Sequence, residues 1–140
     1  MNEQRLQQSG ITLLRVSLGI VLIAHSVYLK MMVFTLPGTA QFFTSLGLPG
    51  FLAYVVFALE ALGGIALILG VQVRWVSLAL VPVLLGATWA HLPAGWLFSN
   101  PNGGWEYPAF LTVAAVAQAL LGDGAGALQK SASVRGLQPA

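Results

Sequence analysis

Four side chains that could do chemistry stand in long apolar runs of the sequence. Glu60 is the one charged residue of YVVFALEALGGIALILG, residues 54–70. Arg15, His25 and His91 have similarly apolar neighbours. Side chains of these types can transfer protons, pair as ions or hydrogen-bond a ligand. Which of these they do depends on whether the apolar runs around them cross a membrane.

The composition indicates a membrane protein. Of the 140 residues, 57% are hydrophobic and 7% are charged, whereas about 25% are charged in soluble domains. No Asp, Glu, Lys or Arg occurs in residues 31–59, 61–73 or 75–105. The basic residues behind the net charge of +2 are scattered, so they form no patch for nucleic acid. The absence of cysteine excludes disulfides, thiol redox chemistry and Cys-ligated iron–sulfur clusters in this chain.

The apolar runs predict an all-α fold, an integral membrane four-helix bundle. A spanning helix needs roughly 20 apolar residues, at about 1.5 Å each, to cross about 30 Å of hydrocarbon. The segments that meet this requirement are residues 11–29, 51–69, 75–92 and 107–121. Residues 1–128 then form a single membrane domain. We expect residues 129–140 to be a polar and poorly ordered tail.

The first loop is predicted to contain a short helix of its own. Residues 37–50, PGTAQFFTSLGLPG, begin and end with Pro-Gly and contain apolar residues between these two turn signals. Thr39 could cap this helix. Its uncharged Phe42 and Phe43 favour an interfacial or re-entrant position on the extracytoplasmic side.

The basic residues predict the orientation of the chain in the membrane. With an even number of spans, both termini and the second loop share one side. That side collects most of the basic residues, namely Arg5, Arg74, Lys130 and Arg135, whereas the other side has Lys30. Because Lys and Arg concentrate on the cytoplasmic side of membrane proteins, both termini are expected in the cytoplasm.

Counting along the spans gives each polar residue a depth. Glu60 falls near the midplane, Arg15 lies just inside the cytoplasmic boundary, and His25 and His91 lie in the outer third. A charge at the midplane costs about 2.5–3.5 kcal/mol, so such a residue usually meets a partner or marks a functional site. Glu60 could pair with Arg15, hydrogen-bond His25 or His91, or stay protonated. Glu60, His25 and His91 are the candidate catalytic residues, and a purely structural pair of Glu60 with Arg15 stays open.

Aromatic residues cluster near the outer mouth of the predicted bundle, which Lys30 and Glu106 flank. These rings either anchor helices at the lipid headgroups or form a flat slot for an aromatic or quinone-like ligand. The candidate ligand-binding residues are Arg15, Lys30, Trp89, Trp105, Glu106 and Tyr107, with Tyr28 and Trp96 nearby.

Haem and metal ions are disfavoured as cofactors. A haem held by His25 and His91 would need facing ligands at one depth and a large cavity, and four short helices leave little room. A metal ion could use His25, His91 and Glu106, but no motif with metal-ligand spacing is present. The cofactor is thus undetermined, with a quinone open and no metal site predicted.

Several motifs occur in an order known from one family. They are RVSLGIVLIAHSVYLK (15–30), LGLPG (46–50), EALGGIALILG (60–70) followed by Arg74, GGWEYP (103–108) and GDGAGAL (122–128). Over about residues 14–128, the chain resembles the DoxX family of small four-helix membrane proteins. The resemblance implies that the recurrent polar positions of the family are occupied by Arg15, His25, Lys30, Glu60, Arg74 and Glu106. The family often has Gly after the first-helix His, where this chain has Ser26.

The resemblance also implies a function in a quinone-linked redox system of the bacterial inner (plasma) membrane. Family members are similar to subunits of quinol oxidase or thiosulfate:quinone oxidoreductase, so an enzymatic role would be that of a quinone-linked oxidoreductase subunit. Because the chain has no recognisable electron carrier, it would need a redox partner protein. Two alternatives stay open, a binding or transport module for a small solute or protons, and a non-catalytic membrane anchor or assembly factor. The other partners considered are the lipid bilayer, a quinone or aromatic small molecule and a second copy of the chain.

Overall fold

A computed structural model of the chain describes residues 1–132, and these residues are all-α. The elements are α1 (Glu3–Ile23), the π-helix η1 (Ala24–Val33), α2 (Leu36–Ser45), α3 (Phe51–Leu69), α4 (Val73–His91), the 3₁₀-helix η2 (Leu92–Ala94) and α5 (Glu106–Leu121). No strand forms among the described residues, and a single isolated bridge joins Val71 to Gln129. The prediction of an all-α fold is confirmed.

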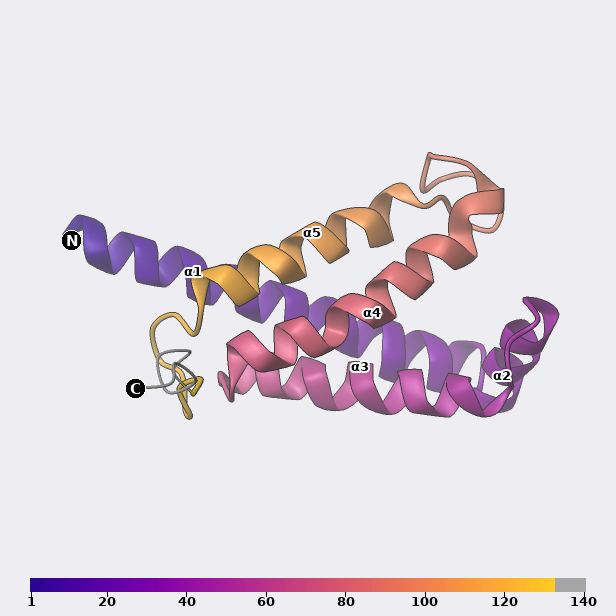
Figure 1. The fold of residues 1–140 in the computed structure, drawn as a ribbon, viewed down its shortest axis with the longest axis horizontal. Coiled ribbons are helices and arrows are strands. Elements are labelled where there is room, and N and C mark those ends of the chain that lie inside the picture. Colours follow the sequence, from indigo (N-terminus) through magenta and orange to yellow (C-terminus); the bar gives the residue numbers. More distant parts are fainter. Residues whose placement is uncertain (133–140) are drawn as a thin grey trace, which may run out of the picture.

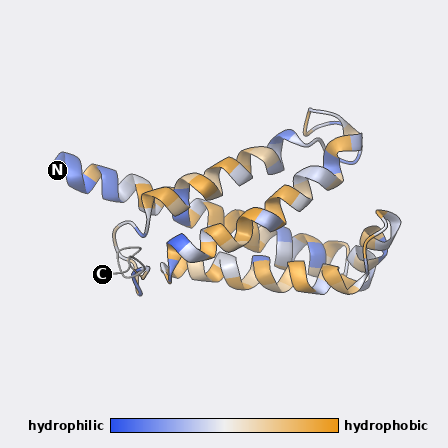
Figure 2. Cartoon of the chain, in the orientation of Figure 1, coloured by the Kyte–Doolittle hydropathy of each residue, from blue (hydrophilic) through white to orange (hydrophobic). Residues whose placement is uncertain are grey.

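Three helices are long and apolar enough to cross a membrane, namely Glu3–Val33, Phe51–Leu69 and Val73–Ala94. The second has the bounds of the predicted span, whereas the first and third extend beyond residues 11–29 and 75–92. Figure 2 shows the apolar character along these helices. The fourth predicted span corresponds to α5, whose 16 residues extend about 24 Å, short of the roughly 30 Å of a hydrocarbon core.

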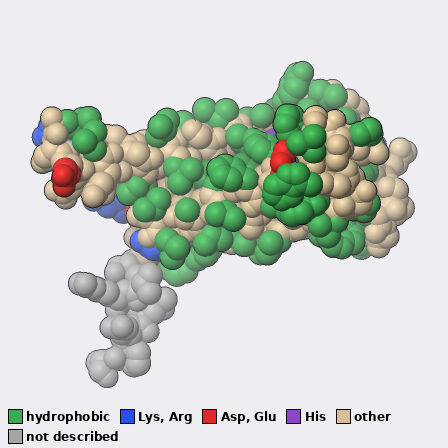
Figure 3. All heavy atoms as spheres, turned by 90° about the horizontal axis from the view of Figure 1, so that it is seen from above, with side chains coloured by type: hydrophobic (Ala, Val, Ile, Leu, Met, Phe, Trp, Pro, Cys, Tyr) green, Lys and Arg blue, Asp and Glu red, His purple; other side chains and the backbone are tan. Residues whose placement is uncertain are grey.

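The four long helices pack lengthwise as two close pairs (Figure 1). One pair is α1 with α3, the other is α4 with α5, and contacts of α3 with α4 and of α1 with α5 join the pairs. Helix α2 packs on α3 and η1 at one end of the molecule. Many large hydrophobic side chains remain on the outside, as Figure 3 shows for one face. Such a surface suits a lipid environment rather than water.

The two ends of the molecule differ in charge. The N-terminus and the last described residues lie at the end opposite α2 (Figure 1), where Ala125 N donates to Gln8 O at 3.4 Å. In Figure 3 the visible Lys and Arg side chains gather toward this end. Arg135, which the sequence assigns to this side, lies outside the described residues.

The last described residues are bound to the turn between α3 and α4. Gln129 O accepts a hydrogen bond from Gln72 N at 2.9 Å. Ser131 Oγ accepts from Arg74 N, also at 2.9 Å. These hydrogen bonds attach residues 129–132, the first residues of the predicted tail, to the helical body. Residues 133–140 of the predicted tail are not among the described residues.

The short helix in the first loop is present as α2, but its cap differs from the prediction. Thr35 is the N-cap, and its Oγ1 accepts from Gly38 N at 3.2 Å. The prediction of Thr39 as the cap is wrong, because the helix starts earlier, at Leu36, with Pro37 in its first turn. Thr39 is instead buried, and its Oγ1 donates to the carbonyls of Thr35 at 2.9 Å and Lys30 at 3.3 Å.

Two glycines allow α1 and α3 to approach each other closely. A Cβ built on Gly19 would lie 2.7 Å from Gly64 O and 2.6 Å from Ile68 Cγ1. A Cβ built on Gly64 would lie 2.9 Å from Gly19 O. Because backbone atoms cannot move aside easily, neither position tolerates a side chain without separating the helices.

We expect Gly64→Ala to lower the free energy of unfolding by about 1–3 kcal/mol, the usual cost of overpacking. Gly86→Ala is the matched control, because Gly86 lies inside α4 and a Cβ built on it would have nothing within 4 Å. That control should be neutral or stabilising, by up to about 1 kcal/mol, since Ala favours helix more than Gly. Thermal unfolding in detergent measures both, and equal effects would contradict the close packing.

Candidate functional site

Glu60 meets Lys30 in the interior of the protein. Glu60 Oε2 accepts from Lys30 Nζ at 2.7 Å, which is the one ion pair in the described part of the chain. The two side chains are 6% and 18% exposed, respectively. The prediction that Glu60 meets Arg15, His25 or His91 is therefore wrong. The side chain of Lys30, which was expected at the outer mouth, instead reaches inward to Glu60. The pair supplies the counter-charge that a buried carboxylate needs.

Arg15 lies at the opposite end of the interior and is 3% exposed. Its guanidinium donates to Asp123 O at 2.8 Å and to Ala125 O at 3.4 Å. It also lies against Gly70, where an added Cβ would collide with Nη1. Gly70 is about 15 Å from Glu60 along α3, so Arg15 cannot reach Glu60. Arg15 fastens the C-terminal segment to α1 and lies away from the other predicted ligand-binding residues.

Apolar side chains fill the space between these two polar levels. Their buried core consists mainly of Leu18, Leu22, Leu67, Leu80, Leu84 and Leu111, with Ala114 and Ala115. Leu67, which stands between Glu60 and Gly70 on α3, is 1% exposed. The hydrogen bonds of residues 1–132 form no continuous path from Glu60 to Arg15.

Both histidines use the same ring nitrogen in the same way. His25 Nδ1 lies 2.9 Å from Val21 O, and His91 Nδ1 lies 2.7 Å from Ala87 O. A carbonyl oxygen can only accept, so Nδ1 must carry the proton in each ring. In the neutral ring Nε2 then presents a lone pair, and neither Nε2 has a hydrogen bond within residues 1–132. Each histidine can therefore accept a proton from a ligand at Nε2.

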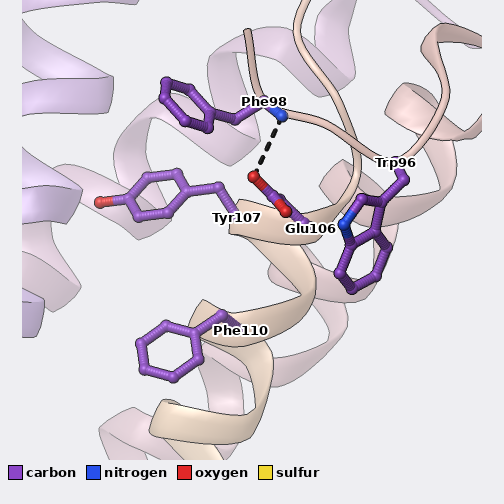
Figure 4. A pocket seen from close by; sticks show the side chains of 5 residues that line it. All are labelled: Trp96, Phe98, Glu106, Tyr107 and Phe110. Atoms are coloured by element: carbon purple, nitrogen blue, oxygen red, sulfur yellow. Dashed lines mark hydrogen bonds between the residues drawn. The ribbon is translucent and has the colours of Figure 1, made fainter. Parts of the chain in front are cut away.

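An apolar hollow of about 650 Å³ lies beside the start of α5. It is lined by Trp96, Phe98, Glu106, Tyr107 and Phe110. Figure 4 shows the rings of Phe98, Tyr107 and Phe110 projecting in one direction, with Trp96 on the other side of Glu106. Phe98 N donates to Glu106 Oε1 at 3.2 Å, which ties the loop to the helix (Figure 4). The volume lies within the range of roughly 300–1,000 Å³ usual for small-molecule sites.

Tyr107 connects the hollow to His25. The centroids of the two rings are 6.0 Å apart, with an angle of 34° between their planes. His25 is therefore the one predicted catalytic residue that the structure brings next to the hollow. His91 lies instead against the loop after η2, with Cδ2 3.4 Å from a Cβ built on Gly103. Glu60 is occupied by Lys30 in the interior.

The predicted ligand-binding residues divide into two groups. Glu106 and Tyr107 line the hollow, and Trp105 packs edge-on against Trp96, with centroids 4.4 Å apart. Trp89 does not line the hollow and is half exposed. Sequence reasoning did not single out Phe98 or Phe110. The spacing of Phe110 three residues after Tyr107 on one helix could have indicated it, whereas Phe98 in a loop has no periodic signal.

The described residues contain no cluster of three or more side chains that could hold a metal ion. The geometry therefore does not bring His25, His91 and Glu106 together as the ligand set considered from the sequence. The hollow, with its aromatic lining and a nearby histidine, suits an organic ligand better than an ion.

Comparison with protein families gives a match to the DoxX family model over residues 10–93. The chain belongs to the DoxX family. The matched part includes His25, Lys30 and Glu60, whereas Glu106 and Tyr107 lie beyond it. In this DoxX protein the family region thus contributes the ion pair and both histidines, and the five residues that line the hollow all lie beyond that region.

One curated relative is the "Putative oxidoreductase CatD" of Bacillus subtilis (strain 168). It is 40% identical to this DoxX protein over 78 residues, which are 56% of this chain and 56% of CatD. The chain therefore spans little more than half the length of this relative. No solved structure matches the chain.

We expect nitrogen NMR of ¹⁵N-labelled histidine to show the Nδ1–H tautomer for both neutral rings, because Val21 O and Ala87 O only accept. His91→Asn assigns the two signals, since the chain contains two histidines. An Nε2–H tautomer for His25 would contradict its hydrogen bond to Val21 and the free acceptor at Nε2.

Proposed function

We propose that this DoxX protein is the quinol-binding subunit of a redox system in the bacterial plasma membrane. The single observation that carries the proposal is the aromatic hollow whose Tyr107 lies beside His25, a histidine with a free acceptor nitrogen. An aromatic ring system fits between aromatic side chains, which favour stacked or edge-on neighbours. The name of CatD as an oxidoreductase is consistent with this proposal.

The hydrogen bond of His25 Nδ1 to Val21 O favours the reduced form of the ligand. A quinone carbonyl needs a hydrogen-bond donor, whereas a quinol hydroxyl can donate to a lone pair. His25 Nε2 offers that lone pair because Nδ1 already donates to Val21 O. When the quinol is oxidised, His25 accepts one hydroxyl proton, the second proton leaves to water, and two electrons pass to a redox centre of a partner protein.

We place the electron acceptor on a partner protein, because the sequence of this chain contains no recognisable electron carrier. It has no cysteine for a cluster and no cluster of metal-binding side chains among its described residues. The role proposed is therefore to bind and orient the quinol and to take up a proton, while the partner supplies the electron acceptor.

The surroundings of the hollow favour access of the ligand from the lipid. Phe98 and Phe110 are 66% and 67% exposed, although they are large apolar side chains. Exposure of this kind suits a site that faces the hydrocarbon, where quinols with long tails dissolve. Glu106 is the one charged group of the lining and marks the side nearer the headgroups.

We expect a short-chain quinol to quench tryptophan fluorescence of the purified protein through Trp96, which lines the hollow. Tyr107→Leu should weaken binding about tenfold, since an aromatic pair contributes up to about 1.5 kcal/mol beyond its buried area. Tyr28→Leu is the matched control, because Tyr28 is exposed and does not line the hollow. Quenching that is absent, or that both variants weaken equally, would exclude the hollow as the quinol site.

We also propose that α1, α3, α4 and α5 all cross the membrane as a four-helix bundle with both termini in the cytoplasm. Arg5 lies in the first turn of α1, Arg74 lies in the first turn of α4, and Lys130 O accepts from Gln72 Nε2 just before α4. These basic residues support this orientation. Because α5 is short, local thinning of the bilayer or exposure of its ends at the headgroups accommodates it.

Single-cysteine variants test this topology, because the chain has no native cysteine. Ser99→Cys lies in the loop before α5 and should react with an impermeant maleimide in intact spheroplasts. Ser9→Cys, near the start of α1, should react only after permeabilisation. Labelling of Ser9→Cys in intact spheroplasts would reverse the orientation.

A further inference from the structure

The segment that carries His25 and Lys30 has an uncommon helical form. The ten residues Ala24–Val33 form the π-helix η1, which continues α1 without a break. Its last turn closes with a hydrogen bond from Phe34 N to Leu29 O at 2.8 Å, five residues apart. Most π-helical segments are single turns, and they are frequent at functional sites. A π-helix of this length needs contacts that keep it from rewinding into an α-helix.

Two side chains bind carbonyls of the preceding turn where η1 begins. His25 Nδ1 donates to Val21 O at 2.9 Å, and Ser26 Oγ donates to Leu22 O at 2.8 Å. In an α-helix these two carbonyls would accept from the backbone N–H groups of His25 and Ser26. Competition of this kind weakens the helical ladder and bends helices. The position of Ser26 in the sequence therefore coincides with the change of helical form.

Lys30 stabilises the other part of the π-helix from inside. Lys30 Nζ donates to Glu60 Oε2 at 2.7 Å and to His25 O at 3.4 Å. The second bond joins residues five apart in the sequence, which is also the spacing of the backbone hydrogen bonds in a π-helix. The carbonyl of Lys30 in turn accepts from Thr39 Oγ1 at 3.3 Å. Helices α2 and α3 thus both hold η1 at Lys30.

We propose that Lys30 and Glu60 are positioning residues that keep η1 in its π-helical form and thereby hold the His25 ring beside Tyr107. Neither residue lines the hollow, and their side chains pair with each other in the interior. Without the pair, η1 rewinds toward an α-helix, which rotates its residues about the helix axis and moves the His25 ring away from Tyr107. The significance of His25 for a quinol rests on the function proposed above, but its position can be tested without any ligand.

The test compares a variant that removes the ion pair with one that keeps it. Lys30→Met/Glu60→Met replaces both charges by apolar side chains, a change that is often neutral for stability. Lys30→Arg keeps donors for both Glu60 and His25 O. In ligand-free protein we expect the Nδ1–H signal of ¹⁵N-labelled His25 to shift or split in the double variant and to stay as in the native protein in Lys30→Arg. His91, which lies on another helix, is the internal reference within the same spectrum.

Glu60→Gln is measured in parallel, because it keeps the shape of the side chain should the double variant not fold. A displaced His25 signal together with an unchanged His91 signal supports the positioning role, because a general loss of stability would change the signals of both histidines. A native His25 signal in both the double variant and Glu60→Gln would overturn it. If the His25 signal moves but the native protein binds no quinol, the proposed function fails and the positioning role stands.

Discussion

A carboxylate buried among apolar helices must find its counter-charge within the protein, and here Lys30 provides it for Glu60. Lipid offers no water to compensate an isolated charge, so the pair constrains the helices around it. It joins α3 to the extension of α1, and the second hydrogen bond of Lys30 reaches the backbone of His25. The position of the histidine beside the aromatic hollow therefore depends on an interaction between two other residues.

The two ends of the molecule satisfy their polar groups in different ways. At the end where α1 and α4 begin, Arg15 and Arg74 donate to the backbone carbonyls of Asp123 and Ala119. At the other end, polar side chains pair with one another or leave an acceptor free, as His25 does. A layer of leucine and alanine separates the two ends. The chemistry that the protein can offer to a ligand is thus concentrated at the end where α5 begins.

The elements were predictable from the sequence where apolar length decides them. The bounds of α3 follow from its apolar run, and the inward position of Glu60 follows from its cost in lipid. The partner of Glu60 was not predictable, because helical spacing of 100° per residue does not apply within a π-helix. Lys30 also has a long flexible stem, so its charged group lies far from the depth of its backbone. The cap at Thr35 and the bound residues 129–132 depend on contacts that no local pattern indicates.

The candidate site was predictable in its chemistry but not in its full composition. Glu106, Tyr107 and His25 were singled out by their type and expected depth; Glu106 and Tyr107 line the hollow, and the His25 ring lies beside Tyr107. Phe98 joins them through a loop whose course is set by the hydrogen bond to Glu106, which sequence cannot give. Trp89 and His91 have a similar expected depth in the membrane, but they do not line the hollow. The sequence indicates the depth of a residue more clearly than the side of the helix that meets a ligand.

The most direct measurement is a double-mutant cycle on the free energy of unfolding, with Lys30→Met, Glu60→Met and both together in detergent. We expect each single variant to lose about 3–5 kcal/mol, because one buried charge remains unpaired, and the double variant to return close to the native value. Additive losses in the double variant would contradict the ion pair as the interaction on which this end of the structure depends.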